Sequence, residues 1–164
     1  LAAQQIGQAL QLCVIDLQLP KDGPNAEGSD QDLDGGVCEL DGQTIGVASL
    51  MPLVIVNPDL SFTGDSEWSM EEGCLSFPEL GQFAVWRPEY IALNYQDRNG
   101  VPHQLKTGGY LGRVIQHEVD HLFGKLFISR MEGKVRKAAQ EKLLLLKPRY
   151  AKAQFWKSGL DKDL

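Results

Sequence analysis

Residues 116–124 read QHEVDHLFG, and this stretch decides what kind of fold the chain adopts. It places His117 and His121 four residues apart, with Glu118 directly after the first histidine. Positions i and i+4 of an α-helix share one face, with Cβ atoms about 5–6 Å apart, so both imidazoles can reach one metal ion. The spacing predicts a helix that carries two metal ligands. The alternative is a pair of ordinary buried or surface histidines, because a motif with three fixed positions also occurs by chance.

The acid beside the first histidine lies on the apolar side of this helix. On a helical wheel, Glu118 falls within the arc that also holds Val114 and Ile115, whereas Arg113 and Asp120 fall on the opposite, polar side. A carboxylate in an apolar arc is poorly hydrated, and that setting suits a group that exchanges protons during a reaction. A simple ion pair is the expected arrangement of Arg113 and Asp120.

Two histidines do not complete a catalytic metal site, which usually has three protein ligands and one open position. No third histidine follows His121, so the remaining candidate lies upstream, in EEGCLSFP at 71–78. There Gly73 allows close approach of the backbone, and a thiolate from Cys74 is a strong ligand for Fe(II) or Zn(II). A lone cysteine is more often a small buried hydrophobe, and that alternative stays open at this point.

The pattern around this helix predicts an α+β fold. Short apolar runs at 11–16 and 53–57 indicate strands, the second of which should stop at Pro58. Residues 90–96 alternate as a strand does, and Asn99–Gly100 then predicts the turn of a hairpin. Strands early in the chain and helices late in it favour α+β over a doubly wound parallel sheet.

Glycine and proline mark where the helices should begin and end. The metal-binding helix should follow Gly108–Gly109 and end at Gly124. Residues 126–128 are expected to form a short strand, and 133–147 a helix that Pro148 breaks or kinks. We therefore predict one domain over 1–164, with antiparallel or mixed sheets packed around a central metal-binding helix, plus a C-terminal helix.

Charge is distributed unevenly along a chain whose net charge is −6. Residues 132–157, the predicted basic C-terminal helix, hold eight Lys and Arg against two Glu, so this segment is +6 and the remainder −12. Residues 18–36 are rich in glycine and acidic residues and are expected to form a solvated loop. No apolar run is long enough for a membrane span, and three cysteines without CxxC spacing fit a reducing compartment.

Three segments together resemble the signature motifs of the peptide deformylase family. EGCLS at 72–76 is similar to the second motif, QHEVDHLFG at 116–124 to the third, and LAAQQIG at 1–7 to the end of the first. The motifs stand in the order and with the spacing of the family, and the resemblance runs from Leu1 to about Met131. The glycines that open the first motif would precede Leu1, so we expect residues upstream of it.

The resemblance implies the composition of the metal site. Cys74, His117 and His121 would bind one divalent metal ion, whose remaining position holds water, and Glu118 would act as general base and acid. Fe(II) is the expected metal, with Zn(II) or Ni(II) as alternatives, and a mixed thiolate and imidazole set suits Fe or Zn rather than Mg or Ca.

The resemblance also implies roles for four residues around the metal. The Gln5 side chain and the Leu75 backbone N–H would stabilise the oxyanion of the tetrahedral intermediate. Glu72 would fix the loop that carries the cysteine. Val114, one turn before the first histidine ligand, is placed to line an apolar pocket for a methionine side chain, and an ordinary core position is an equally good interpretation.

The implied reaction is hydrolysis of the N-formyl group from the N-formylmethionine of nascent polypeptides, with release of formate. In the family the C-terminal helix can contact the ribosome, and the charge of segment 132–157 is compatible with phosphate contacts. A solvated helix face with 143–146 packed on the body is the alternative for that segment. We expect a cytoplasmic protein that binds neither DNA nor a membrane.

Three other interpretations compete with this one. An HExxH-type zinc endopeptidase would carry a third ligand after His121, where the sequence has no histidine. A catalytically inactive, deformylase-like binding protein would have lost part of its machinery, yet Cys74, Glu118 and Gln5 are all present. A purely structural metal site would need a fourth Cys or His ligand, and none is evident.

Overall fold

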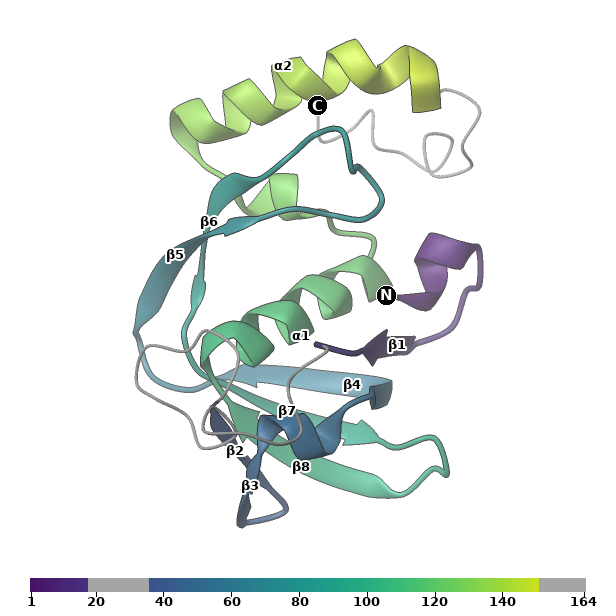
Figure 1. The fold of residues 1–164 in the computed structure, drawn as a ribbon, viewed down its shortest axis with the longest axis vertical. Coiled ribbons are helices and arrows are strands. Elements are labelled where there is room, and N and C mark those ends of the chain that lie inside the picture. The colour runs from purple at the N-terminus through teal and green to yellow at the C-terminus, as the bar shows by residue number, and fades with distance from the viewer. Residues whose placement is uncertain (18–35, 151–164) are drawn as a thin grey trace. The chain divides into compact units, whose positions relative to one another are not determined.

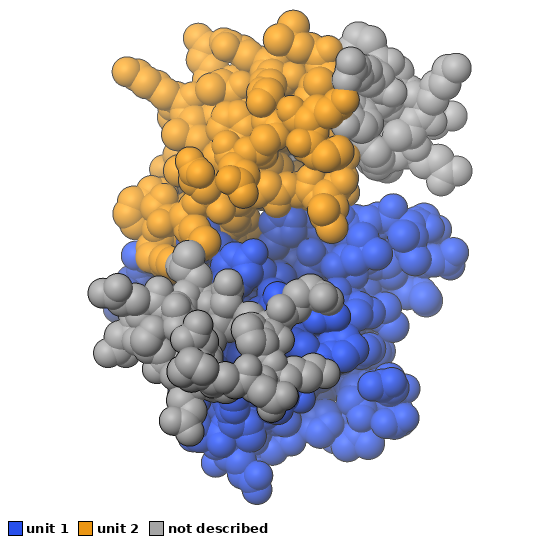
Figure 2. All heavy atoms as spheres, viewed as in Figure 1, with its two compact units in different colours: residues 1–67, 88–124 blue, residues 68–87, 125–164 orange. Residues whose placement is uncertain are grey.

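The computed structural model describes residues 1–17 and 36–146 in full and, for 147–150, the course of the backbone. All but the last residue of the predicted acidic loop at 18–36, and the end of the basic segment beyond residue 150, lie outside the described residues. The chain forms two compact units (Figure 2). Unit 1 comprises Leu1–Glu67 and Pro88–Gly124, and unit 2 comprises Trp68–Arg87 and the chain from Lys125 onward.

Unit 1 is built on a six-stranded sheet with strand order β1-β4-β7-β8-β2-β3, in which every pairing is antiparallel (Figure 1). Alternating burial along the strands turns one face of this sheet toward the core. The strands are β1 Leu12–Ile15, β2 Val37–Leu40, β3 Gln43–Gly46, β4 Leu53–Phe62, β7 Ile91–Gln96 and β8 Pro102–Thr107. Two 3-10 turns, η1 Ala3–Ile6 and η2 Val47–Leu50, complete its N-terminal half.

Strand β4 does not stop at Pro58, and the prediction was wrong on this point. The strand passes through the proline because its register against β7 shifts between Val56 and Asp59, where Asn57 adopts a positive φ of 51°. A bulge of this kind leaves a residue out of the hydrogen-bonded ladder, which is where proline can be accommodated. The predicted hairpin is confirmed, since β7 pairs with β8 and the turn between them has Gly100 at φ 81°.

Helix α1, Gly109–Leu122, packs on the sheet and carries the HExxH segment. It begins and ends where the glycines predicted, with Gly124 at φ 69° donating its N–H to the His121 carbonyl at 3.1 Å. Its apolar side joins the core of unit 1 through Leu111, Ile115, Val119 and Leu122. The arrangement confirms the predicted α+β class.

The side of α1 that the wheel marked as polar is not exposed to solvent. Arg113, Gln116 and Asp120 are all buried. The Gln116 side chain shows how such a face is accommodated, because its Nε2 donates to the carbonyls of Pro88 at 3.0 Å and Gly112 at 3.2 Å. Burying a polar side chain is tolerated when it is hydrogen-bonded, so the polar residues of α1 can be buried like its apolar ones.

Gly108 lets the start of α1 approach the chain at Tyr90. A Cβ at this position would lie 2.6 Å from Tyr90 Cδ1 and 2.9 Å from the Glu89 carbonyl oxygen, so Gly108→Ala should destabilise the fold by about 1–3 kcal/mol through overpacking. Urea denaturation measures this. Gly112→Ala is the matched control, since its Cβ would meet ordinary contacts of 3.6 Å or more and alanine favours a helix. Equal unfolding midpoints for Gly108→Ala and the wild type would show that the contact is not tight.

Asp41, in the turn between β2 and β3, contacts two residues of strand β8. Its Oδ1 accepts the Gln104 N–H at 2.8 Å and its Oδ2 lies 2.7 Å from His103 Nδ1, so the pKa of this carboxyl is lowered, first by the backbone hydrogen bond and then by the histidine. Ionised Asp41 therefore stabilises the fold above its ordinary pKa of 3.8, and that contribution disappears as the pH falls below this value.

Asp41→Asn should consequently be less stable than the wild type at neutral pH, and the gap should narrow below the ordinary carboxyl pKa of 3.8. Urea midpoints measured from neutral pH to about one unit below that value test the sign. A gap that stays constant over this range would contradict the assignment.

Unit 2 contains a two-stranded sheet of β5 Glu67–Glu72 and β6 Phe83–Pro88, whose first and last residues, Glu67 and Pro88, belong to unit 1. It also contains the 3-10 turn η3 Phe127–Arg130 and helix α2 Gly133–Tyr150. Its core is a second apolar cluster, formed by Cys74, Phe77, Leu80, Val85, Phe127, Ile128, Met131, Ala139 and Leu143.

One predicted element of unit 2, a short strand, was wrong, and one alternative for the C-terminal helix is excluded. Residues 126–128 form no strand, because they lead into η3, whose Phe127 and Ile128 fill the core through a tight turn. Helix α2, Gly133–Tyr150, continues through Pro148, so the proline does not break it there, and the kink that we expected as the alternative stays a prediction. Within the described residues, neither helix has the length and apolar character needed to cross a bilayer.

Candidate metal centre

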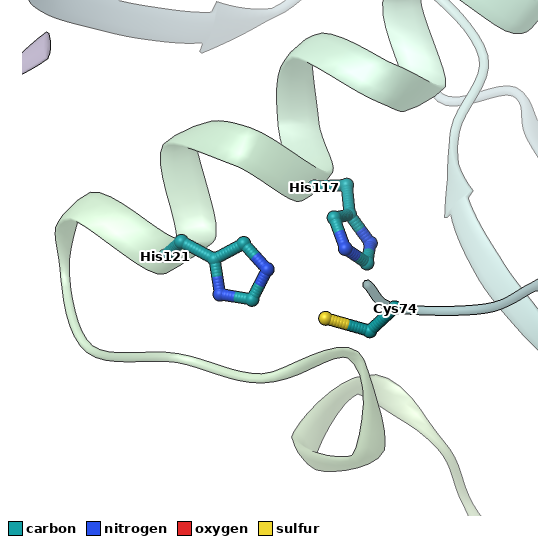
Figure 3. A group of neighbouring side chains, drawn as sticks. All are labelled: Cys74, His117 and His121. Atoms are coloured by element: carbon teal, nitrogen blue, oxygen red, sulfur yellow. The ribbon is translucent and has the colours of Figure 1, made fainter. Parts of the chain in front are cut away.

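The two histidines of α1 lie on one face of the helix, as their spacing predicted. Their ring centroids are 4.9 Å apart and the ring planes meet at 84°, so the imidazoles are edge to face (Figure 3). His121 is buried and His117 is half-buried. The helix backbone thus presents two nitrogen ligands without any distortion of its own.

Cys74 comes from unit 2, two residues after the end of β5. Its side chain is buried within the second apolar cluster, and its carbonyl accepts the Phe77 N–H at 2.9 Å in a tight turn. This turn and the packing of Phe77 and Leu80 hold the cysteine in the segment that precedes β6.

Cys74, His117 and His121 form one group of possible metal ligands, with one donor atom from each residue and all three atoms within 4.8 Å of one another (Figure 3). The ligands of a tetrahedral zinc ion lie about 3.4–3.6 Å apart, given bond lengths near 2.0–2.3 Å. Small side-chain rotations therefore bring this sulfur and these two nitrogens into coordination distance. The set fits a transition metal, whereas Mg or Ca would require oxygen ligands.

Glu118 follows His117 on the same helix, and 8% of its surface is exposed. Its Oε2 forms an ion pair with the Leu1 amino nitrogen at 3.1 Å. A buried carboxylate is retained when a charged partner compensates for its lost hydration. The carboxylate therefore lies on the helix turn that carries the two histidines.

The Gln5 side chain is oriented by the backbone of its own turn. Its Oε1 accepts the Ala2 N–H at 2.6 Å, which leaves Nε2 as the donor end of the amide. The neighbouring Gln4 was not singled out from the sequence. Its Nε2 lies 3.2 Å from the Leu10 carbonyl and 3.4 Å from the Leu122 carbonyl, so it ties η1 to the C-terminal end of α1.

Leu75 and Val114, the remaining predicted site residues, differ in burial. Leu75 is 80% exposed, and the role of its backbone N–H as an oxyanion donor stays a prediction. Val114 is half-buried and packs against the core of unit 1, and its role in a substrate pocket stays a prediction.

Glu72 is paired with Arg87, a partner that sequence reasoning missed. Arg87 Nε lies 2.6 Å from Glu72 Oε1 and its Nη2 lies 2.9 Å from Oε2, with both side chains buried. The only signal in the sequence was an arginine at the end of a strand-like run, and nothing local indicated that it points inward.

The other two cysteines, Cys13 and Cys38, are buried thiols with raised pKa values. Burial raises the pKa of Cys13 to about 12, and the negative charge of Glu118 adds to this effect. Burial also raises the pKa of Cys38. Both thiols therefore remain protonated at neutral pH, and neither belongs to the metal-ligand group.

Comparisons with known proteins agree with this arrangement. A model of the polypeptide deformylase family matches residues 1–137. The peptide deformylase of Opitutus terrae is 47% identical over 84% of this chain and 66% of its own length. That of Chlorobium limicola is 36% identical over 87% of this chain and 63% of its own length. The chain therefore spans just under two thirds of each of these relatives.

Solved structures give the same result. A peptide deformylase of Synechococcus elongatus, determined in complex with actinonin, matches 88% of this chain and 61% of its own with a TM-score of 0.63 and 35% identity. One from Arabidopsis thaliana matches 92% of this chain and 68% of its own with a TM-score of 0.67 and 29% identity. The family model, the relatives and the shared fold together place this chain in the polypeptide deformylase family.

Proposed function

We propose that this chain is a peptide deformylase, which hydrolyses the N-formyl group of N-formylmethionine at the start of nascent polypeptides and releases formate. The observation that carries the proposal is the group of one sulfur and two imidazole nitrogens within 4.8 Å, with the buried Glu118 directly after His117 on the same helix. Family membership supports the reaction type.

In this proposal Cys74, His117 and His121 hold the metal, and their number leaves one position open. A divalent ion held there would supply a Lewis acid that polarises the formyl carbonyl and makes a nearby water more acidic. Glu118 accepts the proton of the attacking water through its buried carboxylate. It then delivers that proton to the leaving amine nitrogen, a role that its position directly after His117 supports.

Two donors would stabilise the oxyanion that forms when water attacks the formyl carbon. The hydrogen bond from the Ala2 N–H to Gln5 Oε1 restrains the amide whose Nε2 would be the first donor. The Leu75 N–H, next to the cysteine ligand, would be the second donor. Donors positioned before the reaction need little reorganisation in the transition state.

The finer assignments form part of the same proposal. We infer Fe(II) as the metal, with Zn(II) or Ni(II) as substitutes, because thiolate and imidazole ligands suit all three. Val114 would line the pocket for the methionine side chain and Glu72 would support the loop of Cys74. A cytoplasmic enzyme with the ribosome as partner follows from a nascent-chain substrate, and the positive residues of α2 would face ribosomal phosphates.

The test is release of formate from formyl-Met-Ala by protein purified without oxygen and loaded with Fe(II). We expect release at substrate levels that leave the acetylated peptide Ac-Met-Ala intact, since a formyl group is smaller than an acetyl group. Protein that binds one metal ion per chain and releases no formate would contradict the proposed function. Cleavage within longer, unformylated peptides would instead favour an endopeptidase.

A further inference from the structure

A buried ion pair lies at the base of the segment that carries Cys74. Arg87 and Glu72 form two parallel hydrogen bonds, of 2.6 and 2.9 Å, and their side chains are only 3% and 5% exposed. Both residues belong to unit 2, at the ends of the two neighbouring strands β5 and β6. A planar guanidinium that meets a carboxylate at two points fixes the direction of that carboxylate as well as its distance.

Stability alone does not account for a pair in this place. Removing two charges from water is costly, and well-packed apolar residues often replace such a pair without loss. A buried ion pair is better explained by the conformation that it selects. The pair with Arg87 selects the conformation of the Glu72 side chain, and only Gly73 separates Glu72 from Cys74.

The loop between β5 and β6 closes on itself at this point. A Cβ at Gly73 would lie 3.5 Å from Gln82 Cγ and 3.6 Å from the Gly81 carbonyl, so the start and the end of the loop are in contact. Arg87 reaches back from β6 to the last residue of β5 and thereby fixes the base of this closed loop. The cysteine is then the first buried side chain beyond the fixed base.

The residue after Arg87 anchors the other ligand-bearing segment. The Pro88 carbonyl accepts a hydrogen bond from Gln116 Nε2 at 3.0 Å, and Gln116 directly precedes His117. Within unit 2, Arg87 thus contacts Glu72, two residues before Cys74. Within unit 1, Pro88 contacts Gln116, the residue before His117.

We propose that Arg87 is a positioning residue of the metal centre, which holds the Glu72 carboxylate so that the Cys74 thiolate is in place before the metal binds. The proposal rests on the proposed assignment of Cys74 as a ligand. It goes beyond that assignment because it gives Arg87, which touches neither substrate nor metal in this scheme, a share in metal affinity. Without the pair the loop would sample other conformations, and the metal would be bound more weakly and released faster.

The experiment replaces the pair by apolar residues, Glu72→Leu with Arg87→Met, so that no uncompensated charge remains in the core. Co(II) is the probe, because its thiolate charge-transfer and visible bands report on the cysteine bond and on the geometry around the ion. Affinity and release rate are measured in the full chain, with thermal unfolding as the check on folding. Lys106→Met is the matched control, since it removes an exposed ion pair with Glu39 at 2.7 Å.

We expect the double variant to fold and to bind Co(II) about 10–100-fold more weakly than the wild type, with an altered thiolate band, which is the usual effect of losing a residue that orients a ligand. Lys106→Met should match the wild type. If the folded double variant binds Co(II) with wild-type affinity and an unchanged spectrum, the pair is only structural and the proposal fails.

Arg87→Lys is tested instead if the double variant shows no cooperative thermal unfolding and is therefore not folded. It retains the charge but loses the two-point contact, so a faster release of Co(II) supports positioning and wild-type release contradicts it. These readouts are independent of the reaction. A wild type with a Co(II)–thiolate band but no formate release would contradict the proposed function alone, whereas absence of that band in the wild type would remove the ligand assignment itself.

Discussion

Glu118→Gln should lower kcat/KM for formate release from formyl-Met-Ala by about 10²–10⁴-fold while metal binding is retained. Glutamine has nearly the same size as glutamate, and Glu118 lies in the buried part of α1, so the fold should tolerate the exchange. The amide cannot accept the proton of the attacking water or return it to the leaving amine. The exchange removes the carboxylate and leaves the rest of the side chain in place.

The matched control makes the same chemical change at an exposed position. Glu132 lies just before α2 and is exposed, so Glu132→Gln should keep wild-type activity. Metal analysis of both variants should give one ion per chain, which separates loss of proton transfer from loss of the metal. Glu118→Gln with more than about a tenth of wild-type kcat/KM would show that another group carries the proton.

The parts of the fold that the sequence predicted well are governed by local rules. Helix α1 follows from its apolar period and from Gly124, which favours the positive φ that ends a helix. The hairpin of β7 and β8 follows from Asn99–Gly100 in the same way. These patterns depend only on neighbouring residues in the sequence, so they can be interpreted without knowledge of tertiary packing.

The errors arose where neighbours distant in sequence decide the outcome. Pro58 was taken as a stop because the bulge that accommodates it depends on register with β7. The face of α1 with Arg113 and Asp120 was identified as polar, but a helical wheel gives no information on burial, and both residues are buried. Residues 126–128 were apolar enough for a strand but lacked a strand partner, and a tight turn buries them equally well.

The residues of the candidate site show the same difference between local and long-range information. The pair His117 and His121 could be predicted from spacing on one helix. Cys74 was a candidate with an open alternative until the resemblance supported it, because periodicity gives no information on which distant segment meets a helix. Arg87 and Gln4 could not be found from the sequence. Each acts through contacts with residues far along the chain or with backbone carbonyls, which leave no pattern in the sequence itself.

Cys74→Ala should abolish metal binding at concentrations that saturate the wild type, with an affinity loss of more than about 100-fold. Changes in residues that merely orient a ligand already cost about 10–100-fold, so removal of the only sulfur ligand should cost more. Formate release should fall with the metal content. The variant should also lose the stabilisation that bound metal gives the wild type, seen as a melting temperature that no longer rises with added Co(II).

Cys38→Ala is the control for this prediction, because it also removes a buried thiol and should cost similar packing. The Cys38 thiol contacts the Ile45 carbonyl at 3.6 Å and lies outside the metal-ligand group, so this variant should keep the metal, the thiolate band and the activity. Comparison of the two variants separates the effect of losing a metal ligand from the effect of losing a buried thiol. Full metal content and a retained thiolate band in Cys74→Ala would mean that another residue supplies the third ligand, and the reaction scheme built on Cys74 would then be wrong.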